Sequence, residues 1–400
     1  MKVSGIICEY NPFHNGHLYH INETRKNGAT HIAAVMSGNF VQRGDTAIID
    51  KLERARLAVR SGADLVIELP VQYCLSSAEN FAAGAVWLLD CLGAVDEISF
   101  GSECGDTDLL LRALEAVDIT AETHTSEIHS IMEKGYTYPR ALNSVINGID
   151  PEIGAVISEP NNLLAIEYMR ALRRFSSEMK PFTVKRISAA HDSDIPEGEF
   201  ASASYIREKL AAGQNISDIS DYMTPIWSEA LSAAEDRGEI ASFSRLERVL
   251  LYKLRSADID EIAAINDVGQ GLEHRIYGAR MSGSLDELLF TVKTKRYTMA
   301  RIRRIMLSLL IGITKADMQQ LPPYGRILAF NERGKEILSR AKNTARLPFA
   351  ASIAKLSQLN DTAKRFAELE IRASDVYGLA LETVSSAQKD YRARIKIDLE

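Results

Sequence analysis

The sequence predicts an α/β protein in which a Rossmann-like, doubly wound parallel sheet is followed by a mainly α-helical C-terminal domain. From residue 3 to about residue 190, short β-branched runs alternate with longer runs of helical periodicity. Beyond about residue 215 the strand signal fades and the helical periodicity continues alone. We therefore expect two domains, 1–215 and 216–400, with their boundary between about 205 and 225.

Five apolar runs are the candidate strands of the first domain: VSGIIC (3–8), HIAAVM (31–36), ADLVIEL (63–69), EISF (97–100) and FTVKRI (182–187). Helical patterns lie between them, the clearest being KLERARLAVRSG (51–62), ENFAAGAVWLLDCLG (79–93) and PNNLLAIEYMRALRR (160–174). Strands that are separated by helices pair in parallel through right-handed crossovers, and this connectivity gives a doubly wound sheet.

The second domain contains four clear helical patterns, which are SRLERVLLYKLRS (244–256), DELLFTVKTKR (286–296), TMARIRRIMLSLLIGI (298–313) and the long stretch 361–386. A short apolar run, GRILAF (325–330), follows Pro322 and Pro323. We expect this run to form one isolated strand in an otherwise helical domain.

The composition, 46% hydrophobic and 25% charged, is that of a soluble globular chain, and the net charge of −7 argues against binding polyanions through the bulk surface. The longest weakly polar run (82–95) contains Asp90 and is too short to span a bilayer, and the N-terminus does not resemble a secretion signal. The four cysteines stand far apart, as in reduced cytoplasmic proteins. We expect a cytoplasmic protein without a membrane partner, and nothing in the sequence indicates a protein partner.

Polar loops follow three of the candidate strands: EYNPFHNGH after the first, SGNFVQRGD after the second and GSECGD after the fourth. The carboxyl ends of parallel strands share one rim of the sheet, and ligands bind there in open α/β folds. Three such loops on one rim therefore predict a binding pocket.

The segment NPFHNGHLYH follows the first strand and has three histidines at steps of three, His14, His17 and His20. A zinc site is one interpretation, but no Cys or carboxylate completes the ligand set, so we assign no metal site. A purely structural helix start capped by Asn15 is a second interpretation. We favour a phosphate site, because Gly16 lets the backbone approach a ligand and the tip of the following helix attracts anions.

His14 and His17 are the candidate catalytic residues of such a site, as neutral or protonated hydrogen-bond donors. In nucleotidyl transfer, negative charge builds on the oxygens of the attacked α-phosphate while pyrophosphate leaves, and preorganised donors lower the barrier. Imidazole suits this task because it can donate a hydrogen bond near pH 7.

The run His14-Asn15-Gly16-His17 resembles the His-x-Gly-His signature of the HIGH-motif nucleotidyltransferase superfamily. A second segment, SASYIREKL (202–210), resembles the Ser-Ser/Thr-x-x-Ile-Arg motif that opens a helix and binds the β- and γ-phosphates in those enzymes. The residues that match this second motif are Ser202, Ser204 and Arg207. The resemblance implies a sheet of the HIGH nucleotidyltransferase type and a phosphate-binding role for these three residues.

A narrower resemblance covers nearly the whole chain. The segments GIICEYNPFHNGHLYH, MSGNFVQRG, GADLVIELP, SAENFAAGAV, FGSE and PNNLLAIEYMRAL are similar to those of the bacterial tRNA(Met) cytidine acetate ligase family. This implies an ATP-dependent ligase that activates acetate as acetyl-adenylate and releases pyrophosphate. The acetyl group then passes to the wobble cytidine of elongator tRNA(Met), giving N4-acetylcytidine, and we expect Mg²⁺ to screen the phosphates.

The resemblance also implies a set of ATP contacts, which are Ile7, Cys8, Glu9, Tyr10, Asn11, Pro12, Phe13, His14, Asn15, Gly16, His17, Leu18, Tyr19, His20, Gly101, Asn162 and Arg186. The last three fall on the predicted rim, after the fourth strand, in the first turn of a helix and at the end of the fifth strand. For Lys51 and Arg54 a place in the site and a solvated helix face are equally compatible with the sequence.

The segment KTKRYTMARIRR (293–304) is densely basic and has no acidic residue, in a chain that is acidic overall. A solvated helix explains this segment by itself, whereas the family resemblance favours contact with tRNA phosphates and splayed anticodon bases. The candidate tRNA-binding residues are Lys293, Lys295, Arg296, Arg301 and Arg304.

Two other functions stay open at this point. A small-molecule adenylyltransferase of cofactor synthesis would use the same motif, but it would need further Arg or Lys around the pocket and no helical second domain. A non-catalytic RNA-binding protein would hold the nucleotide as a structural ligand and would release neither AMP nor pyrophosphate.

Overall fold

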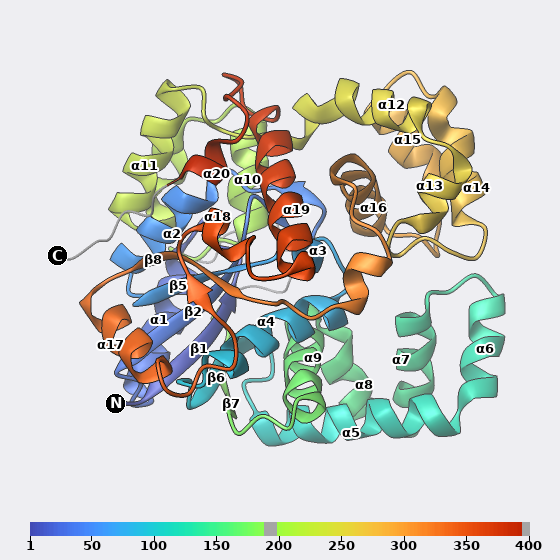
Figure 1. Cartoon of the computed structure of the whole chain (residues 1–400). Coiled ribbons are helices and arrows are strands. Elements are labelled where there is room, and N and C mark those ends of the chain that lie inside the picture. The colour runs from blue at the N-terminus through green and yellow to red at the C-terminus, as the bar shows by residue number, and fades with distance from the viewer. Residues whose placement is uncertain (188–197, 394–400) are drawn as a thin grey trace.

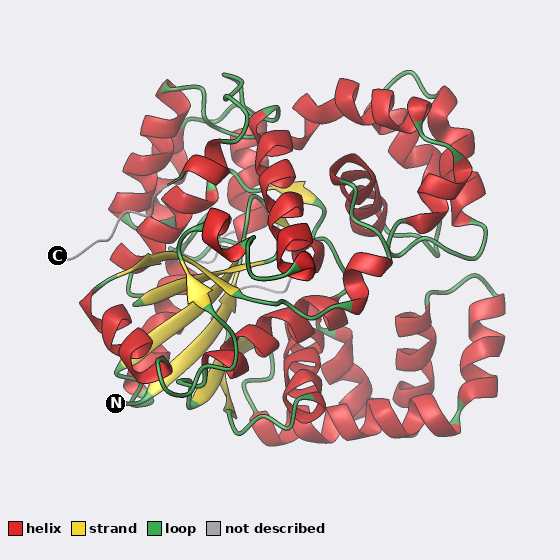
Figure 2. Ribbon diagram, in the orientation of Figure 1, coloured by secondary structure: helices red, strands yellow, loops and turns green. Residues whose placement is uncertain are grey.

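The structure, a computed structural model that describes residues 1–187 and 198–393, contains a seven-stranded sheet on one side and helices that extend away from it (Figures 1 and 2). The strands of this sheet are β1 (Val3–Cys8), β2 (His31–Ser37), β5 (Leu65–Leu69), β6 (Glu97–Ser102), β7 (Lys180–Lys185), β8 (Gly325–Phe330) and β9 (Phe349–Ala350). A separate two-stranded hairpin consists of β3 (Phe40–Val41) and β4 (Asp45–Thr46).

The predicted parallel sheet and its five candidate strands are confirmed. The strand order is β7-β6-β1-β2-β5-β8-β9, and the pairs β1–β2, β1–β6, β2–β5 and β6–β7 are parallel. The chain adds strands on one side of β1 as far as β5 and then crosses to the other side at β6. The carboxyl ends of β1 and β6 therefore form the topological switch point, where open α/β sheets bind their ligands.

The α-helices of the first half are α1 (Asn15–Lys26), α2 (Lys51–Arg60), α3 (Val71–Cys74), α4 (Ala78–Leu92), α5 (Thr107–Thr123), α6 (Thr125–Glu133), α7 (Tyr138–Ile149), α8 (Pro151–Ser158), α9 (Pro160–Arg174) and α10 (Ala203–Ala211). Those of the second half are α11 (Pro225–Asp236), α12 (Glu247–Ser256), α13 (Ile259–Ala264), α14 (Leu272–Gly278), α15 (Leu285–Val292), α16 (Met299–Ile311), α17 (Glu332–Ala341), α18 (Ile353–Leu356), α19 (Asp361–Gly378) and α20 (Lys389–Arg392). The described residues also contain four 3₁₀ helices, Ile216–Tyr222, Phe243–Leu246, Ala279–Met281 and Ala316–Gln319.

Helices cover both faces of the sheet, because successive residues of each strand point to opposite sides. Val35 packs into a core shared with α4 and α9, whereas its neighbours Ala34 and Met36 pack into a core shared with α1 and α2. All seven residues of β2 are buried, as expected of a central parallel strand. Helices α5 to α8 follow β6 and precede α9 in the sequence, and they extend the first of these cores away from the sheet (Figure 1).

The run 325–330, expected to form an isolated strand, joins the central sheet instead. It forms β8, which pairs antiparallel with β5 and places Ile327 opposite Ile67. The exposed edge of β5 offers unpaired backbone groups, and pairing satisfies the groups of both strands. The second half of the chain thus returns to the first half, and α12 to α16 pack with α19 around a separate core. The boundary near residue 215 stays a prediction.

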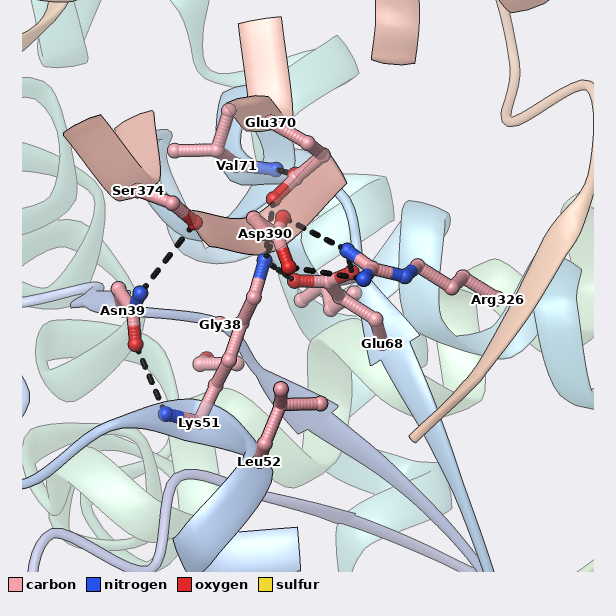
Figure 3. Close-up of polar contacts among 12 residues, drawn as sticks. Gly38, Asn39, Lys51, Leu52, Glu68, Val71, Arg326, Glu370, Ser374 and Asp390 are labelled. Atoms are coloured by element: carbon pink, nitrogen blue, oxygen red, sulfur yellow. Dashed lines mark hydrogen bonds and ion pairs between the residues drawn. The ribbon is translucent and has the colours of Figure 1, made fainter. Parts of the chain in front are cut away.

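A buried group of five charged side chains, which we call the ion cluster, joins the two halves (Figure 3). Its members are Lys51 (α2), Glu68 (β5), Arg326 (β8), Glu370 (α19) and Asp390 (α20), all of them buried. Asp390 lies at the centre, with its carboxylate oxygens 2.8 Å from Lys51 Nζ and 2.8 Å from Arg326 Nη2. Glu68 is 2.5 Å from Lys51 Nζ and 3.0 Å from Arg326 Nη1.

Glu370 differs from the other two carboxyl groups of the ion cluster. Burial, together with the charge of Glu68, raises its pKa well above the ordinary value. For Asp390, burial acts in the same direction, but the attraction of Lys51 and Arg326 outweighs it and lowers the pKa. Of the three carboxyl groups, Glu370 is therefore the one whose charged form the surroundings favour least, which brings the ion cluster closer to a balance of two cations and two carboxylates.

This charge balance predicts a large difference between two conservative variants. Asp390→Asn removes a carboxylate that neutralises two buried cations, and such a loss costs about 3–5 kcal/mol of unfolding free energy. Glu370→Gln replaces the carboxyl whose charged form is favoured least, so it should cost about 1 kcal/mol or less. Chemical denaturation of the full chain, followed by circular dichroism, measures both values. Equal losses in the two variants would contradict this difference between the two carboxyl groups.

Candidate active site

The histidine segment lies at the switch point of the sheet, where it connects the end of β1 to the start of α1. The side chain of His14, the N-cap of α1, accepts a hydrogen bond from the Gly16 N–H at 3.1 Å. The side chain of His17 accepts from the His14 N–H at 3.2 Å, so the two residues form a reciprocal capping box. The cap is thus His14 and not Asn15, the residue named in the structural interpretation.

The capping box fixes which ring nitrogen of each histidine carries the proton. In both rings the accepting atom is Nδ1, and a neutral imidazole with an accepting Nδ1 carries its proton on Nε2. The rings of His14 and His17 stack with their centroids 3.8 Å apart. Both residues therefore offer an N–H donor from Nε2 and have no free acceptor nitrogen.

The surroundings keep these rings neutral. Burial, followed by the positive charges of Arg186 and Arg207, lowers the pKa of His14 to about 3. Burial and the neighbouring His14 lower the pKa of His17 well below its ordinary value. At neutral pH the pair consists of two uncharged donors, and the arrangement provides hydrogen bonds to an anion without a permanent charge.

The structure gives a second, local reason for a glycine at position 16, besides the one inferred from the sequence. A Cβ atom at this position would lie 2.9 Å from His14 Cε1, so a side chain would displace the ring. Glycine here thus secures the orientation of His14, in addition to any approach of a ligand to the backbone.

The side chain of the third histidine, His20, does not join the stacked pair but contacts the sheet. His20 Nε2 lies 2.9 Å from Ser99 Oγ on β6, and Thr24 Oγ1 lies 2.7 Å from the same hydroxyl. Burial, followed by the positive charge of Arg186, lowers the pKa of His20 to about 4. The structure therefore joins His20 to the sheet, one helical turn beyond the stacked pair.

Side chains of the turn before His14 hold it in place, by contacts with one another and with residues elsewhere in the chain. Tyr10 has a positive φ of 46°, and its ring packs edge-on against Phe13, with the centroids 4.9 Å apart. Phe13 stacks on Trp227 of α11 at 5.6 Å. Asn11 accepts a hydrogen bond from the Ile48 N–H at 2.7 Å. The connection leaves β1 through this turn, with Pro12 inside it.

The other residues expected to contact ATP in this segment flank the turn and the helix. Ile7 and Cys8 end β1, and burial raises the pKa of the Cys8 thiol, which disfavours a thiolate. Leu18 packs against the core of α1 and α2, and the Tyr19 ring meets Phe200 edge-on at 6.5 Å. Asn15 Nδ2 donates to the backbone oxygens of Glu199 and Asp221, both at 2.9 Å.

The second motif lies against the first, as the phosphate interpretation requires. Arg207 on α10 donates from Nη1 to the Asn11 carbonyl at 2.6 Å and from Nη2 to Ser204 Oγ at 3.3 Å. Ser202 is the N-cap of α10, and its hydroxyl accepts from the Tyr205 N–H at 3.1 Å. The structure therefore brings Arg207 to the histidine segment, whereas the Ser202 hydroxyl caps its own helix.

The residues on the far side of the switch point also meet. Gly101 lies on β6 next to Arg186, and a Cβ atom at Gly101 would be 3.4 Å from Arg186 Cγ. Asn162 is buried, and its Oδ1 accepts from the backbone N–H groups of Glu103 and Cys104, at 2.9 and 3.2 Å. Asn162 thus holds the loop after β6 with its side chain.

Two neighbours of Asn162, Glu103 and Asn161, also lie on this side of the site, although nothing in the sequence singled them out as site residues. The carboxylate of Glu103 accepts from the Asn161 and Asn162 N–H groups at 3.3 and 2.8 Å and so caps α9. Asn161 Oδ1 accepts from Arg186 Nη1 at 3.5 Å, which turns Asn161 toward the site. The only available signal was their position inside the segments FGSE and PNNLLAIEYMRAL.

The solvated-face interpretation of Lys51 and Arg54 is wrong, because both side chains are buried. Lys51 belongs to the ion cluster. Arg54 donates to the backbone oxygens of Glu9, Ser37 and Gly38. Arg54 therefore ties the loop after β2 to the start of the histidine segment.

The five basic residues expected to bind tRNA fall into two groups. Lys293 and Lys295 are exposed at the end of α15 and beyond it, and Arg296 is half-buried and donates to Gln270 Oε1. Arg301 and Arg304 on α16 turn inward. Arg301 Nη2 donates to the Asp267 carbonyl at 2.6 Å, and Arg304 Nη1 donates to the Gln42 carbonyl at 3.1 Å.

Within residues 1–187 and 198–393, no three His, Cys, Asp or Glu side chains lie close enough together to hold a metal ion. Of the helices that the structure describes, none combines the length and the apolar character needed to cross a membrane.

Comparison with known proteins gives matches over nearly the full length. A family model described as HIGH Nucleotidyl Transferase matches residues 1–392. The tRNA(Met) cytidine acetate ligase of Thermoanaerobacter sp. (strain X514) is 40% identical over 400 residues, with 98% of each chain covered. The protein of the same name from Acetivibrio thermocellus is 38% identical over 395 residues, with 94% of each chain covered.

Solved structures agree with these matches. The crystal structure of apo Thermotoga maritima TmcAL has a TM-score of 0.92 and 31% sequence identity to this chain, with 99% of both chains covered. The same protein bound with alpha-thio ATP has a TM-score of 0.90. The chain therefore belongs to the HIGH nucleotidyl transferase family and, within it, to the family of the tRNA(Met) cytidine acetate ligases.

Proposed function

We propose that this protein is an ATP-dependent ligase that activates acetate as acetyl-adenylate and acetylates the wobble cytidine of elongator tRNA(Met) to N4-acetylcytidine. The observation that supports this most directly is the pair of neutral Nε2–H donors of His14 and His17 beside Arg207, in a chain that is 40% identical to relatives of that name. A tRNA substrate also implies a cytoplasmic location.

In the first step a carboxylate oxygen of acetate attacks the α-phosphorus of ATP. The new O–P bond forms as the bond to the β-phosphate oxygen breaks, and pyrophosphate leaves with the electron pair. The Nε2–H groups of His14 and His17 stabilise the charge that develops on the α-phosphate oxygens. Arg207, which lies beside Asn11, holds the departing pyrophosphate.

Mg²⁺ bound with the triphosphate would screen the charge of the phosphate groups. The part of the chain that the structure describes contains no cluster of three metal-binding side chains, so the phosphate oxygens would supply most of the ligands. The adenosine half of ATP would lie toward Gly101 and Arg186, since the phosphate ligands occupy the other side of the switch point.

The tRNA-binding surface in this proposal begins at Lys293, Lys295 and Arg296, at the end of α15 and in the turn before α16. Lys293 and Lys295 are free to neutralise RNA phosphates because they are exposed. Arg301 and Arg304 do not contact the RNA in this proposal. They support the surface indirectly, because they hold α16 against the Asp267 loop and the β3–β4 hairpin.

The function is tested by incubating the full-length protein with labelled acetate, ATP and elongator tRNA(Met). Digestion of the RNA should give labelled N4-acetylcytidine, and AMP and pyrophosphate should form in amounts equal to the product. A tRNA(Met) with uridine at the wobble position is the matched control and should stay unlabelled. Labelled RNA from both substrates, or no label in either, would refute the proposed function.

Replacing His14 should affect the first step most. His14→Ala removes one donor from the α-phosphate, and we expect acetate-dependent ATP–pyrophosphate exchange to fall about 10²–10³-fold. His14→Gln keeps an N–H near the position of Nε2 and should retain more activity than the alanine variant. His129→Ala, on the surface of α6, is the control. Exchange at the wild-type rate in His14→Ala would exclude the proposed role.

Replacing the exposed lysines should weaken RNA binding without a change in specificity. For Lys293→Ala/Lys295→Ala we expect the affinity for tRNA(Met) to fall about tenfold at low salt. The slope of log K against log salt should decrease by about 1–2, because up to two phosphate contacts are lost. Filter binding over a salt series measures both quantities, with Lys335→Ala on α17 as the control. An unchanged slope would show that these two lysines do not contact the tRNA phosphates.

A further inference from the structure

The second step of the proposed reaction requires a proton acceptor, and this inference rests on the proposed function. The N4 amine of the cytidine attacks the acyl carbon of acetyl-adenylate and forms the C–N bond. The acyl C–O bond to the phosphate then breaks, and AMP leaves with the electron pair. The nitrogen loses one proton in the process, and a group near the acyl carbon has to accept it.

The two site histidines are unsuited to this task. Each of their Nδ1 atoms already accepts a backbone N–H, and each Nε2 carries the ring proton. Burial also lowers the pKa of both rings, and this opposes the uptake of a second proton. His20 is engaged with Ser99 at the sheet.

Two of the carboxylates around the site are committed to structural contacts. Both oxygens of Glu103 accept hydrogen bonds at the start of α9. Asp45 accepts from the Thr46 N–H at 2.8 Å and lies 3.6 Å from Arg303.

Glu9 is different, because only one of its oxygens is in use. Oε1 accepts a hydrogen bond from the Gln42 N–H at 2.8 Å, and Oε2 has no hydrogen-bond partner among residues 1–187 and 198–393. The side chain is half-buried at the end of β1, two residues before Asn11, whose carbonyl oxygen accepts from Arg207. The charge of Glu9 acts on Arg207, where it opposes the lowering of the pKa by burial.

Glu9 is also on the side of the site that faces the basic segment. Gln42, whose N–H donates to Glu9, also accepts a hydrogen bond through its own carbonyl oxygen, from Arg304 on α16 at 3.1 Å. The hairpin and the helix touch closely, since a Cβ atom at Gly44 would lie 2.6 Å from the Arg304 backbone nitrogen. The backbone of one residue, Gln42, thus joins the carboxylate to the helix that follows the proposed tRNA-binding lysines.

We propose that Glu9 is the general base of the acetyl-transfer step. Its free Oε2 accepts the N4 proton of the wobble cytidine as the C–N bond forms, and the Gln42 N–H holds the carboxylate in place through Oε1. The step is balanced, because the carboxylate gains the proton and AMP takes the electron pair of the broken C–O bond.

The test compares the two half-reactions in Glu9→Gln. The glutamine oxygen still accepts from the Gln42 N–H, but the side chain is no longer basic. Acetyl transfer is measured in a single turnover, by mixing enzyme-bound acetyl-adenylate with tRNA(Met), and adenylate formation is measured as pyrophosphate exchange. We expect transfer to fall at least tenfold more than exchange, within the 10²–10⁴-fold range of general-base catalysis.

Asp45→Asn is the matched control, because it removes a second negative charge that acts on Arg207 and leaves Glu9 intact. Both half-reactions should change by less than threefold in this variant. Equal losses of transfer and exchange in Glu9→Gln would overturn the proposal, as would a selective loss of less than tenfold. A wild-type protein that acetylates no tRNA would refute the proposed function, which separates that failure from a failure of this inference.

Discussion

The reciprocal hydrogen bonds between the backbone and the rings of His14 and His17 determine the chemistry of the site. A capping box usually uses hydroxyl and carboxylate side chains, whereas here two imidazoles satisfy the free N–H groups at the start of α1. The same bonds select the tautomer, the stacking and the direction of both rings. A local requirement of helix formation thus produces a pair of aligned donors at the switch point of the sheet.

A second set of contacts fixes the position of these two histidines relative to the rest of the molecule. Arg54 binds the carbonyl of Glu9 and those of the loop after β2, and Arg207 binds the carbonyl of Asn11. The segment between β1 and α1 is therefore held by two guanidinium groups, from α2 and from α10. The helix α2 is itself anchored by Lys51 in the ion cluster, which includes residues from both halves of the chain.

The strands and the histidine segment could be predicted because each depends on local pattern. Buried parallel strands are continuous apolar runs, and the His-x-Gly-His spacing directly follows one of them. The antiparallel pairing of β8 with β5 could not be predicted, because a six-residue apolar run carries no information about which strand it pairs with. The same limit applies to Lys51 and Arg54, whose burial depends on carboxylates and carbonyls far away in the sequence.

Two neighbouring asparagines show how far the roles of single residues can be predicted from a sequence. Asn161 and Asn162 lie in the same first turn of α9, so their spacing gives no way to tell which one points inward. The structure directs Asn162 to the loop after β6 and Asn161 to Arg186. Tautomers are equally invisible in a sequence, since they depend on which backbone group reaches which ring nitrogen.

The ion cluster has a consequence for biosynthesis. Lys51 and Asp390 are separated by 339 positions, so a ribosome makes the cation long before its carboxylate partner. Until Asp390 emerges from the ribosome, Lys51 and Arg326 lack the partner that lies between them, and burial of these charges stays unfavourable. The sheet can assemble during translation, but the ion cluster is complete only after Asp390 has been made.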